Sequence, residues 1–317
     1  MKYRTSLASL LLVGALILPV SAAALTSRQT GQDNSAPIAE NLTLTTYKGV
    51  AITSRFAAVD PDGDEVTFQV VDSPARGQVT VDENDSAAFW YTPYEGKKGK
   101  DSFTYVATDS NGNVSEPATV KITIEKQSTK VTYSDMAGEA AHYAALKLAE
   151  TGVYVGRQVG DLYCFDPDEA FTREEFLALA MTVAGMEPLS GVTLTGFSDD
   201  KDIPTWAKGY VSAALVGGAV RGSYNDNGQV VFNVGSAVSR AEAAVIVDRL
   251  LATEDVTVHA MAAQAVPAWA SQSVANLETV SVLADPYDMS EPLTRGEAAQ
   301  MLAAMQDVLA NRDTGWF

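Results

Sequence analysis

Three arginines in the C-terminal half of the chain recur inside the same short motif. Arg173, Arg240 and Arg295 each follow a Ser or Thr and stand two residues before a Glu. Ser or Thr with Glu three residues later forms the capping box of a helix N-terminus, so each arginine is predicted at the first helical position. The helix dipole disfavours a cation there by about 0.3–1 kcal/mol. An unfavourable residue used three times predicts a role beyond the helix.

Anion binding is the chemistry that suits such an arginine. The first turn of a helix has free N–H groups, and a guanidinium beside it adds a bidentate fork for a carboxylate or phosphate. The alternative is a salt bridge to an acidic neighbour such as Asp135 or Asp199. The repetition favours the ligand, and as exposed first-turn residues the three arginines are expected to contribute little to stability.

Aromatic residues and glycines accompany the arginines. Tyr143, Trp206 and Trp269 are predicted at equivalent places on the helices that precede the arginine helices. There they either complete the core, the commoner role, or stack on sugar faces beside a groove. Gly156 and Gly222 lie in the connecting turns, where they would let backbone N–H groups approach a ligand.

Alternating carboxylates mark a second candidate site, in the N-terminal half. Asp60, Asp62 and Asp64 alternate on a loop with Gly63, and Asp109 lies in a later turn. Carboxylates at this spacing suit calcium, the one cofactor the sequence suggests. The 12-residue EF-hand pattern is absent, and Asp, Pro and Gly are also ordinary turn residues, so a plain turn is favoured.

Catalysis has little support in the sequence. The histidines are His142 and His259 and the cysteine is Cys164, none within a triad or zinc motif, so we expect no enzyme. A glycosidase using paired carboxylates, such as a wall-remodelling hydrolase, stays open as an alternative. With 22 Lys and Arg against 40 Asp and Glu, the net charge of −18 argues against nucleic acid and anionic membranes as partners.

The N-terminus resembles an export signal. Lys2 and Arg4 precede an apolar stretch, residues 7–20, and small residues follow at 21–24. This order predicts a signal peptide over 1–24, a linker over 25–33, and no membrane span in the mature form.

Residues 34–125 are predicted to form an all-β sandwich. Short runs of Thr, Val, Ile and aromatic residues alternate with turns about every ten residues, which favours antiparallel strands. The segment resembles the bacterial cadherin-like, immunoglobulin-like repeat family through several pieces: Asn34-Ser-Ala-Pro37, Asp60-Pro-Asp-Gly-Asp64, Tyr91-Thr-Pro93, residues 99–105 and Asp109-Ser-Asn-Gly112. The resemblance implies a stalk or adhesive module at a cell surface.

A threefold repeat of helix, turn and helix follows a linker over 126–132. The units are predicted at 133–190, 191–255 and 256–313, and because one helix pair buries little surface, the three should share a core. Each unit carries the arginine motif. The first unit opens with Tyr-x-Asp at Tyr133, and the second opens with Phe-x-Asp at Phe197. The third lacks this opening and the turn glycines.

This order of motifs resembles the S-layer homology family, whose members usually carry three such modules. The resemblance implies a mainly α-helical pseudo-threefold trimer whose grooves bind a pyruvylated secondary cell-wall polysaccharide. It implies that Arg173, Arg240 and Arg295 contact the pyruvate carboxylate. Because the third unit has a degenerate turn, Arg295 is expected to matter least.

The sequence therefore predicts an exported surface protein, held non-covalently in the cell wall by its C-terminal half and displaying the sandwich outward. An alternative is an adhesin whose main ligand site for carbohydrate or protein is the sandwich itself.

Overall fold

The computed structural model describes residues 34–257, 266–283 and 288–313. The predicted signal peptide and linker, His259 and residues 284–287 of the third unit lie outside these ranges. Within them, no helix combines the length and the apolar character needed to cross a bilayer.

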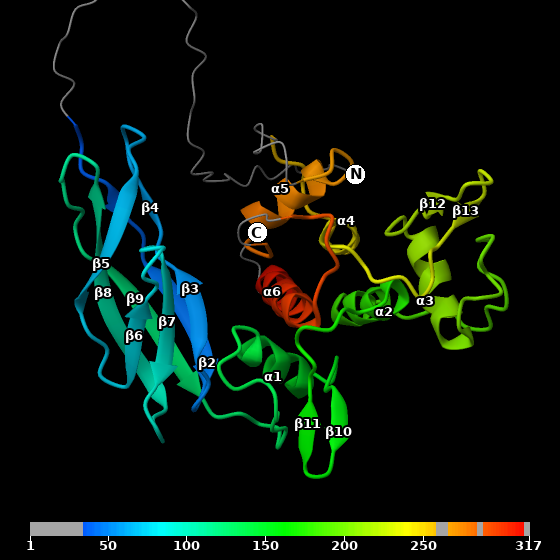
Figure 1. Ribbon diagram of the computed structural model, residues 1–317, viewed down its shortest axis with the longest axis horizontal. Helices are drawn as coiled ribbons and strands as arrows, with labels where there is room; N and C mark the ends of the chain where they lie inside the picture. Colours follow the sequence, from blue (N-terminus) through cyan, green and yellow to red (C-terminus); the bar gives the residue numbers. More distant parts are fainter. Residues whose placement is uncertain (1–33, 258–265, 284–287, 314–317) are drawn as a thin grey trace, which may run out of the picture. The chain divides into compact units, whose positions relative to one another are not determined.

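Two facing sheets make up the first half (Figure 1). The larger has the order β2-β9-β8-β5 and the smaller the order β3-β7-β6, while β1 pairs with β4. The strands are β1 Ile38–Ala39, β2 Leu42–Tyr47, β3 Ile52–Arg55, β4 Ala58–Val59, β5 Val66–Asp72, β6 Gly77–Val81, β7 Ala88–Pro93, β8 Gly99–Asp109 and β9 Ala118–Glu125.

Alternation along the strands builds the sandwich core, as the sequence predicts. In β9, Val120, Ile122 and Ile124 are buried while the residues between them face outward. They pack with aromatic residues from both sheets, including Phe89 and Phe103. One pairing departs from the expected antiparallel pattern, because the first long strand, β2, runs parallel to β9. Alternation specifies which face is buried but not the direction of the neighbouring strand.

Helix pairs make up the second half, as predicted. The first unit contains α1 (His142–Glu150) and α2 (Arg173–Val183), the second α3 (Thr205–Val216) and α4 (Arg240–Leu251), and the third α5 (Ser271–Thr279) and α6 (Arg295–Asp313). The connections in the first two units are more regular than turns. They form the hairpins β10–β11 (Arg157–Val159, Leu162–Cys164) and β12–β13 (Ser223–Tyr224, Val230–Val231).

The segments that enter the second helices are joined by backbone hydrogen bonds. The segment before α2 pairs with the one before α4: Arg173 N–H donates to Ser236 O at 2.9 Å, and Val238 N–H to Phe171 O at 3.1 Å. The segment before α4 repeats this with the one before α6, through Arg240 N–H to Glu291 O at 3.0 Å.

The series closes on itself. Leu293 N–H donates to Val238 O at 2.8 Å, and Arg295 N–H returns to Glu169 O of the first unit at 2.6 Å. Isolated bridges occur at all three junctions: Thr172–Ala237, Ser239–Pro292 and Ala170–Thr294. We call this closed set of segments the entry ring. It orders the units cyclically, so each arginine helix begins against the next unit, and the third unit against the first.

Apolar side chains of the entry ring are buried at the junctions. Phe171, Val238 and Leu293 are each less than 5% exposed and belong to the core shared by the three helix pairs. This common core agrees with the expectation that single helix pairs bury too little surface to be stable alone.

Truncation of the ring should therefore destabilise the helical half. Leu293→Ala is expected to lower the free energy of unfolding by about 2–5 kcal/mol, because it removes buried methyl groups and leaves a cavity. Urea unfolding followed by circular dichroism at 222 nm measures the change. Leu194→Ala, at a leucine that is 75% exposed, serves as the control and should stay within about 0.5 kcal/mol of wild type. Equal effects of the two substitutions would contradict the role of the ring.

Candidate functional site

All three arginines occupy the first position of their helices, behind intact capping boxes. In α2 the Thr172 hydroxyl accepts from Glu175 N–H while Glu175 accepts from Thr172 N–H. The same reciprocal bonds are made at α4 and at α6, with Glu242 and Glu297 as the glutamates. The capping motif thus folds locally as the sequence indicates.

Each arginine forms an ion pair with an acid of the next unit in the cycle. Arg173 lies 2.6 Å from Glu242 and Arg240 2.8 Å from Glu297, whereas Arg295 lies 3.5 Å from Asp166. Glu242 and Glu297 are capping-box residues, so one carboxylate serves its own helix and the neighbouring unit.

The arginines are more buried than first-turn residues are expected to be. The exposed fractions of the Arg173, Arg240 and Arg295 side chains are 11%, 16% and 22%, so the expectation of exposed arginines is wrong. The salt-bridge alternative named Asp135 and Asp199, but these carboxylates accept backbone N–H groups instead, for example from Phe165 and Phe232. The entry ring explains both results, because it places each arginine against the next unit.

The three guanidinium groups differ in how many of their nitrogens form hydrogen bonds. Arg240 binds Glu297 through Nε and Nη2, and its Nη1 donates to Asp288 O at 3.0 Å. Among the described residues, the Nε atoms of Arg173 and Arg295 are buried without a hydrogen-bond partner. A buried N–H left unpaired costs roughly 1–3 kcal/mol, so these two guanidinium groups are less fully bonded than that of Arg240.

Arg173 lines a cavity of about 390 Å³, which we call groove A. It combines the arginine of the first unit, the turn and the second helix of the second unit, and an aromatic residue of the third. Its lining residues are Arg173, Ala219, Val220, Arg221, Gly222, Ser223, Glu242, Val245, Ile246, Arg249 and Trp269.

Arg295 lines a second cavity of about 190 Å³, which we call groove B. Its composition follows that of groove A one step round the cycle: an arginine of the third unit, a turn and a second helix of the first, and an aromatic residue of the second. Its lining residues are Tyr154, Phe171, Glu175, Ala178, Leu179, Trp206 and Arg295.

Both indole side chains are exposed at the grooves: Trp206 is 52% and Trp269 is 61% exposed. Trp206 lies on α3, but Trp269 lies in the turn before α5 rather than on the helix as predicted. Such surface-exposed indoles suit stacking on a ligand better than closing a core.

Tyr143 does not occupy the equivalent position. The first helices end in matching turns, with positive φ at Gly152, Gly218 and Ser281. Aligned on these turns, the counterpart of the two tryptophans in the first unit is Ala140. Tyr143 is instead half-buried against the core, and burial is the main cause that raises its pKa to about 12. Comparison of the three repeats by sequence matched Tyr143 to the two tryptophans because all three are aromatic. The turns at the helix ends show instead that Ala140 is the structural counterpart.

The partners of Arg240, and not those of Arg295, belong to the third unit. Arg295 shares groove B with Tyr154 of the first unit's turn, while Arg240 contacts Asp288 and Glu297 of the third unit. The expectation that Arg295 matters least assumed that each arginine meets the turn of its own unit. The cyclic order removes this premise, because each arginine meets a neighbouring unit; that Arg295 matters least for binding stays a prediction.

Gly156 and Gly222 shape the hairpin connections. Both have positive φ, and a Cβ at Gly156 would lie 2.5 Å from Cys164 O, while one at Gly222 would lie 2.6 Å from Val231 O. The predicted approach of their N–H groups to a sugar stays a prediction; the structure supplies a steric reason for glycine at both positions.

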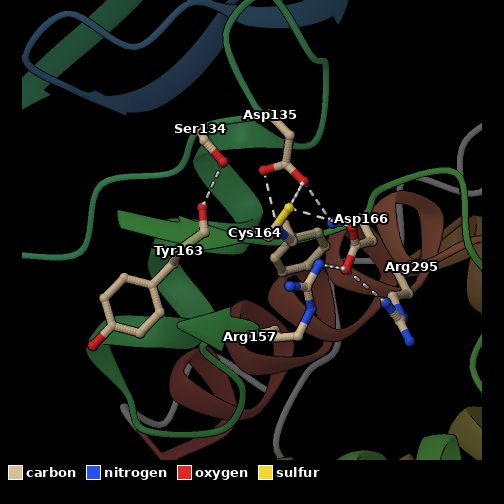
Figure 2. Close-up of polar contacts among 8 residues, drawn as sticks. Ser134, Asp135, Arg157, Tyr163, Cys164, Asp166 and Arg295 are labelled. Carbon is tan, nitrogen blue, oxygen red and sulfur yellow. Dashed lines mark hydrogen bonds and ion pairs between the residues drawn. The ribbon is translucent and has the colours of Figure 1, made fainter. Parts of the chain in front are cut away.

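Cys164 lies within a small polar cluster near groove B (Figure 2). Its Sγ contacts Asp135 and Asp166 at 3.2 and 3.3 Å, and these three are the metal-ligating side chains that converge in the described part of the chain. Asp135 is already engaged by the N–H groups of Phe165 and Asp166. Figure 2 also shows Arg157 and Arg295 approaching Asp166. Through the hydrogen bonds that Phe165 and Asp166 donate to Asp135, the cluster holds the turn that precedes the first segment of the entry ring.

The four aspartates of the sandwich have other partners. Asp60 Oδ1 accepts from the N–H groups of Asp62 and Asp64, and Asp64 accepts from Asn111. Asp62 accepts from Ser35 N–H, and Asp109 accepts from Asn113 N–H. The bonds of Asp60 and Asp109 lie within connecting turns, while those of Asp62 and Asp64 join different loops of the domain. Calcium binding by these residues stays a prediction.

Sequence reasoning missed two arginines, Arg221 and Arg249, both in groove A. Signals for both were present. Arg221 directly precedes Gly222 in the predicted turn, and Arg249 lies two helical turns after Glu242, on the same face of α4.

Comparison with known proteins assigns one domain of the chain. Residues 34–123 match the family model of the bacterial Ig domain. The chain is also similar to the surface-layer 125 kDa protein of Lysinibacillus sphaericus, at 28% identity over 128 residues, covering 40% of this chain and 10% of the relative. It is 39% identical over 88 residues to an amylopullulanase of Thermoanaerobacterium thermosulfurigenes, covering 27% of this chain and 4% of that one. The chain thus spans a tenth or less of these curated relatives.

Solved structures give weaker similarity. The sialic acid binding region of a Streptococcus sanguinis adhesin matches with a TM-score of 0.24 and 20% identity, over 32% of each chain. Fibronectin(III)-like modules of Clostridium thermocellum CbhA match with a TM-score of 0.21 and 20% identity, over 29% of this chain and 47% of that one. Both TM-scores are too low to support a ligand or an activity.

The turn glycines generate a prediction about stability. Gly156→Ala and Gly222→Ala are each expected to lower the free energy of unfolding by about 2–4 kcal/mol, because a close contact adds to the strain of positive φ. Gly160→Ala is the matched control: its φ is also positive, at 64°, but nothing lies within 4 Å of the added Cβ. It should cost about 1 kcal/mol. Chemical denaturation compares the variants, and three equal losses would show that the contact is irrelevant.

Asp135 generates a pH dependence. Burial raises the pKa of this carboxyl, but hydrogen bonds from Phe165 and Asp166 outweigh burial and hold it below the usual 3.8. Its stabilising effect is therefore complete above about pH 4 and is lost as pH falls through the folded-state pKa. Asp135→Asn should destabilise most at neutral pH and progressively less below pH 4. Denaturant midpoints measured from pH 7 to 3 test this, and a difference that does not change with pH would contradict it.

Proposed function

We propose that the helical half is an anchor of the S-layer homology type, which binds an anionic secondary cell-wall polysaccharide, such as a pyruvylated one, in grooves A and B. In this proposal the chain is an exported protein of the cell surface. The anchor holds it non-covalently in the wall, and the bacterial Ig domain extends outward as a stalk or adhesive module.

One observation carries the proposal: two grooves have the same composition although different units build them. Each combines a largely buried arginine of one unit, whose Nε is unpartnered, an exposed indole of a second unit and the turn of the remaining unit. Core packing alone does not require an exposed indole at corresponding places beside an incompletely bonded guanidinium.

The chemistry of these parts suits an acidic sugar. An indole face stacks on the apolar face of a pyranose, and the guanidinium fork offers charge-assisted hydrogen bonds to a carboxylate. Such bonds are worth about 1.5–3 kcal/mol each. Two modest grooves on one rigid core then bind a repeating polymer more tightly than either does alone, because the second contact is intramolecular.

Similarity to a surface-layer protein supports the proposed location, and a bacterial Ig domain is suited to a stalk. The proposed role is binding rather than catalysis. It requires no nucleic acid or membrane partner, in keeping with the acidic composition.

The tryptophans provide the test. The Trp206→Ala/Trp269→Ala double variant is expected to lose most of its sedimentation with purified wall sacculi, since both stacking platforms are removed. Both side chains are exposed, so its circular dichroism spectrum and melting temperature should stay close to those of wild type. Each single variant should retain partial binding, because one groove remains.

Tyr224→Ala is the matched control, at an aromatic residue that is 79% exposed and outside both grooves; it should bind like wild type. A second control uses sacculi stripped of the polysaccharide, which should bind none of the proteins. Full sedimentation of the folded double variant, or equal sedimentation with stripped and intact sacculi, would overturn the proposal.

A further inference from the structure

Groove A carries a surplus of positive charge that groove B lacks. Arg173, Arg221 and Arg249 line groove A together with one glutamate, Glu242. Groove B has one arginine, Arg295, and one glutamate, Glu175. The formal charge of the lining is therefore +2 in groove A and zero in groove B, in a chain whose net charge is −18.

The surplus arises at two positions that have neutral counterparts in the first unit. Aligned on the turn that ends at Gly156 or Gly222, Arg221 corresponds to Val155. Aligned on the capping boxes of α2 and α4, Arg249 corresponds to Thr182. Neither arginine is needed for the repeated fold, because the first unit builds the same turn and helix without them.

Within the described ranges, no ion pair with an acid accounts for the extra arginines. Arg249 donates to Ala219 O at 3.1 Å, and among the described residues no carboxylate pairs with Arg221 or Arg249. Both side chains are exposed. Partial desolvation, followed by repulsion from Arg221 and Arg173, lowers the pKa of Arg249, although Asp248 opposes the shift. Positive charges gathered at one cavity attract an anionic ligand.

We infer that groove A is the high-charge subsite of the chain and takes a sugar that bears a doubly charged substituent of the phosphate monoester class. Groove B takes a sugar with no more than one negative charge. The inference rests on the proposed function, because it assumes that both grooves hold sugars, and it extends that function by assigning their charge.

Geometry and charge agree with this assignment. A phosphate monoester carries close to two negative charges at neutral pH and three acceptor oxygens, and guanidinium groups bind such oxygens bidentately. Arg173, Arg221 and Arg249 supply the positive charge of the lining, and Trp269 offers a face for the sugar ring. A single carboxylate would neutralise only half of the surplus.

Two sugars of similar size but different charge test the inference: glucose 6-phosphate and glucuronate. The full chain would be titrated with each at matched ionic strength. Indole N–H signals in ¹H–¹⁵N spectra report on each groove, with Trp206 and Trp269 assigned from their Trp→Phe variants. We expect the Trp269 signal to respond to glucose 6-phosphate at about tenfold lower concentration than to glucuronate, and the Trp206 signal to show no such preference.

Arg221→Gln/Arg249→Gln should abolish the preference at Trp269, whereas Arg221→Lys/Arg249→Lys should retain most of it, because the charge is kept. Val155→Ala/Thr182→Ser changes the counterpart positions of the first unit and should leave the Trp269 titrations unchanged. Equal responses of Trp269 to the two sugars, or a preference that survives the glutamine variant, would overturn the inference.

The two proposals fail separately. Wall binding that depends on Trp206 and Trp269 without any preference for the phosphate would leave the proposed function standing and remove the inference. A phosphate preference at Trp269 without wall binding would leave the charge assignment of groove A and remove the polysaccharide anchor.

Discussion

A closed set of backbone hydrogen bonds between the three helix-entry segments determines the rest of the C-terminal half. Each segment donates to the next and the third returns to the first, with Arg295 N–H bonded to Glu169 O. Buried polar backbone groups require partners, so a helix that begins inside the core must begin against another chain segment. The arginine at each helix start is consequently held beside the neighbouring unit, and every groove is built from more than one unit.

Because the ring is cyclic, a change in one unit alters a groove whose arginine comes from another. The third unit meets Arg240 of the second, through Asp288 and Glu297. Arg240 is also the arginine whose guanidinium is fully occupied, by Glu297 and Asp288 O. Arg173 and Arg295 keep an unpartnered Nε and line the two cavities. Three copies of one motif thus yield two guanidinium groups with an unpartnered Nε and one whose nitrogens are all bonded.

The capping glutamates connect local and tertiary stability. Glu242 completes the first turn of α4 and also pairs with Arg173 of the preceding unit. Removing such an acid would open a capping box and leave a largely buried guanidinium without its counter-charge, two costs that add at one site. The same coupling means that an arginine of this motif serves packing as well as ligand binding, so substitutions that keep its charge separate the two roles better than alanine.

The sequence by itself determined the local features: the strands and aromatic core of the bacterial Ig domain, the helix pairs, and the capping boxes that place Arg173, Arg240 and Arg295 at helix starts. These follow from residue periodicity and from contacts within four residues. It did not reveal the parallel pairing of β2 with β9, the partners of the arginines, the register that replaces Tyr143 by Ala140, or the gathering of Arg221 and Arg249 beside Arg173. Those depend on which segments distant in the chain become neighbours, and only the tertiary structure decided that, because the backbone hydrogen bonds that join them, in the sandwich as in the entry ring, have no side-chain signature.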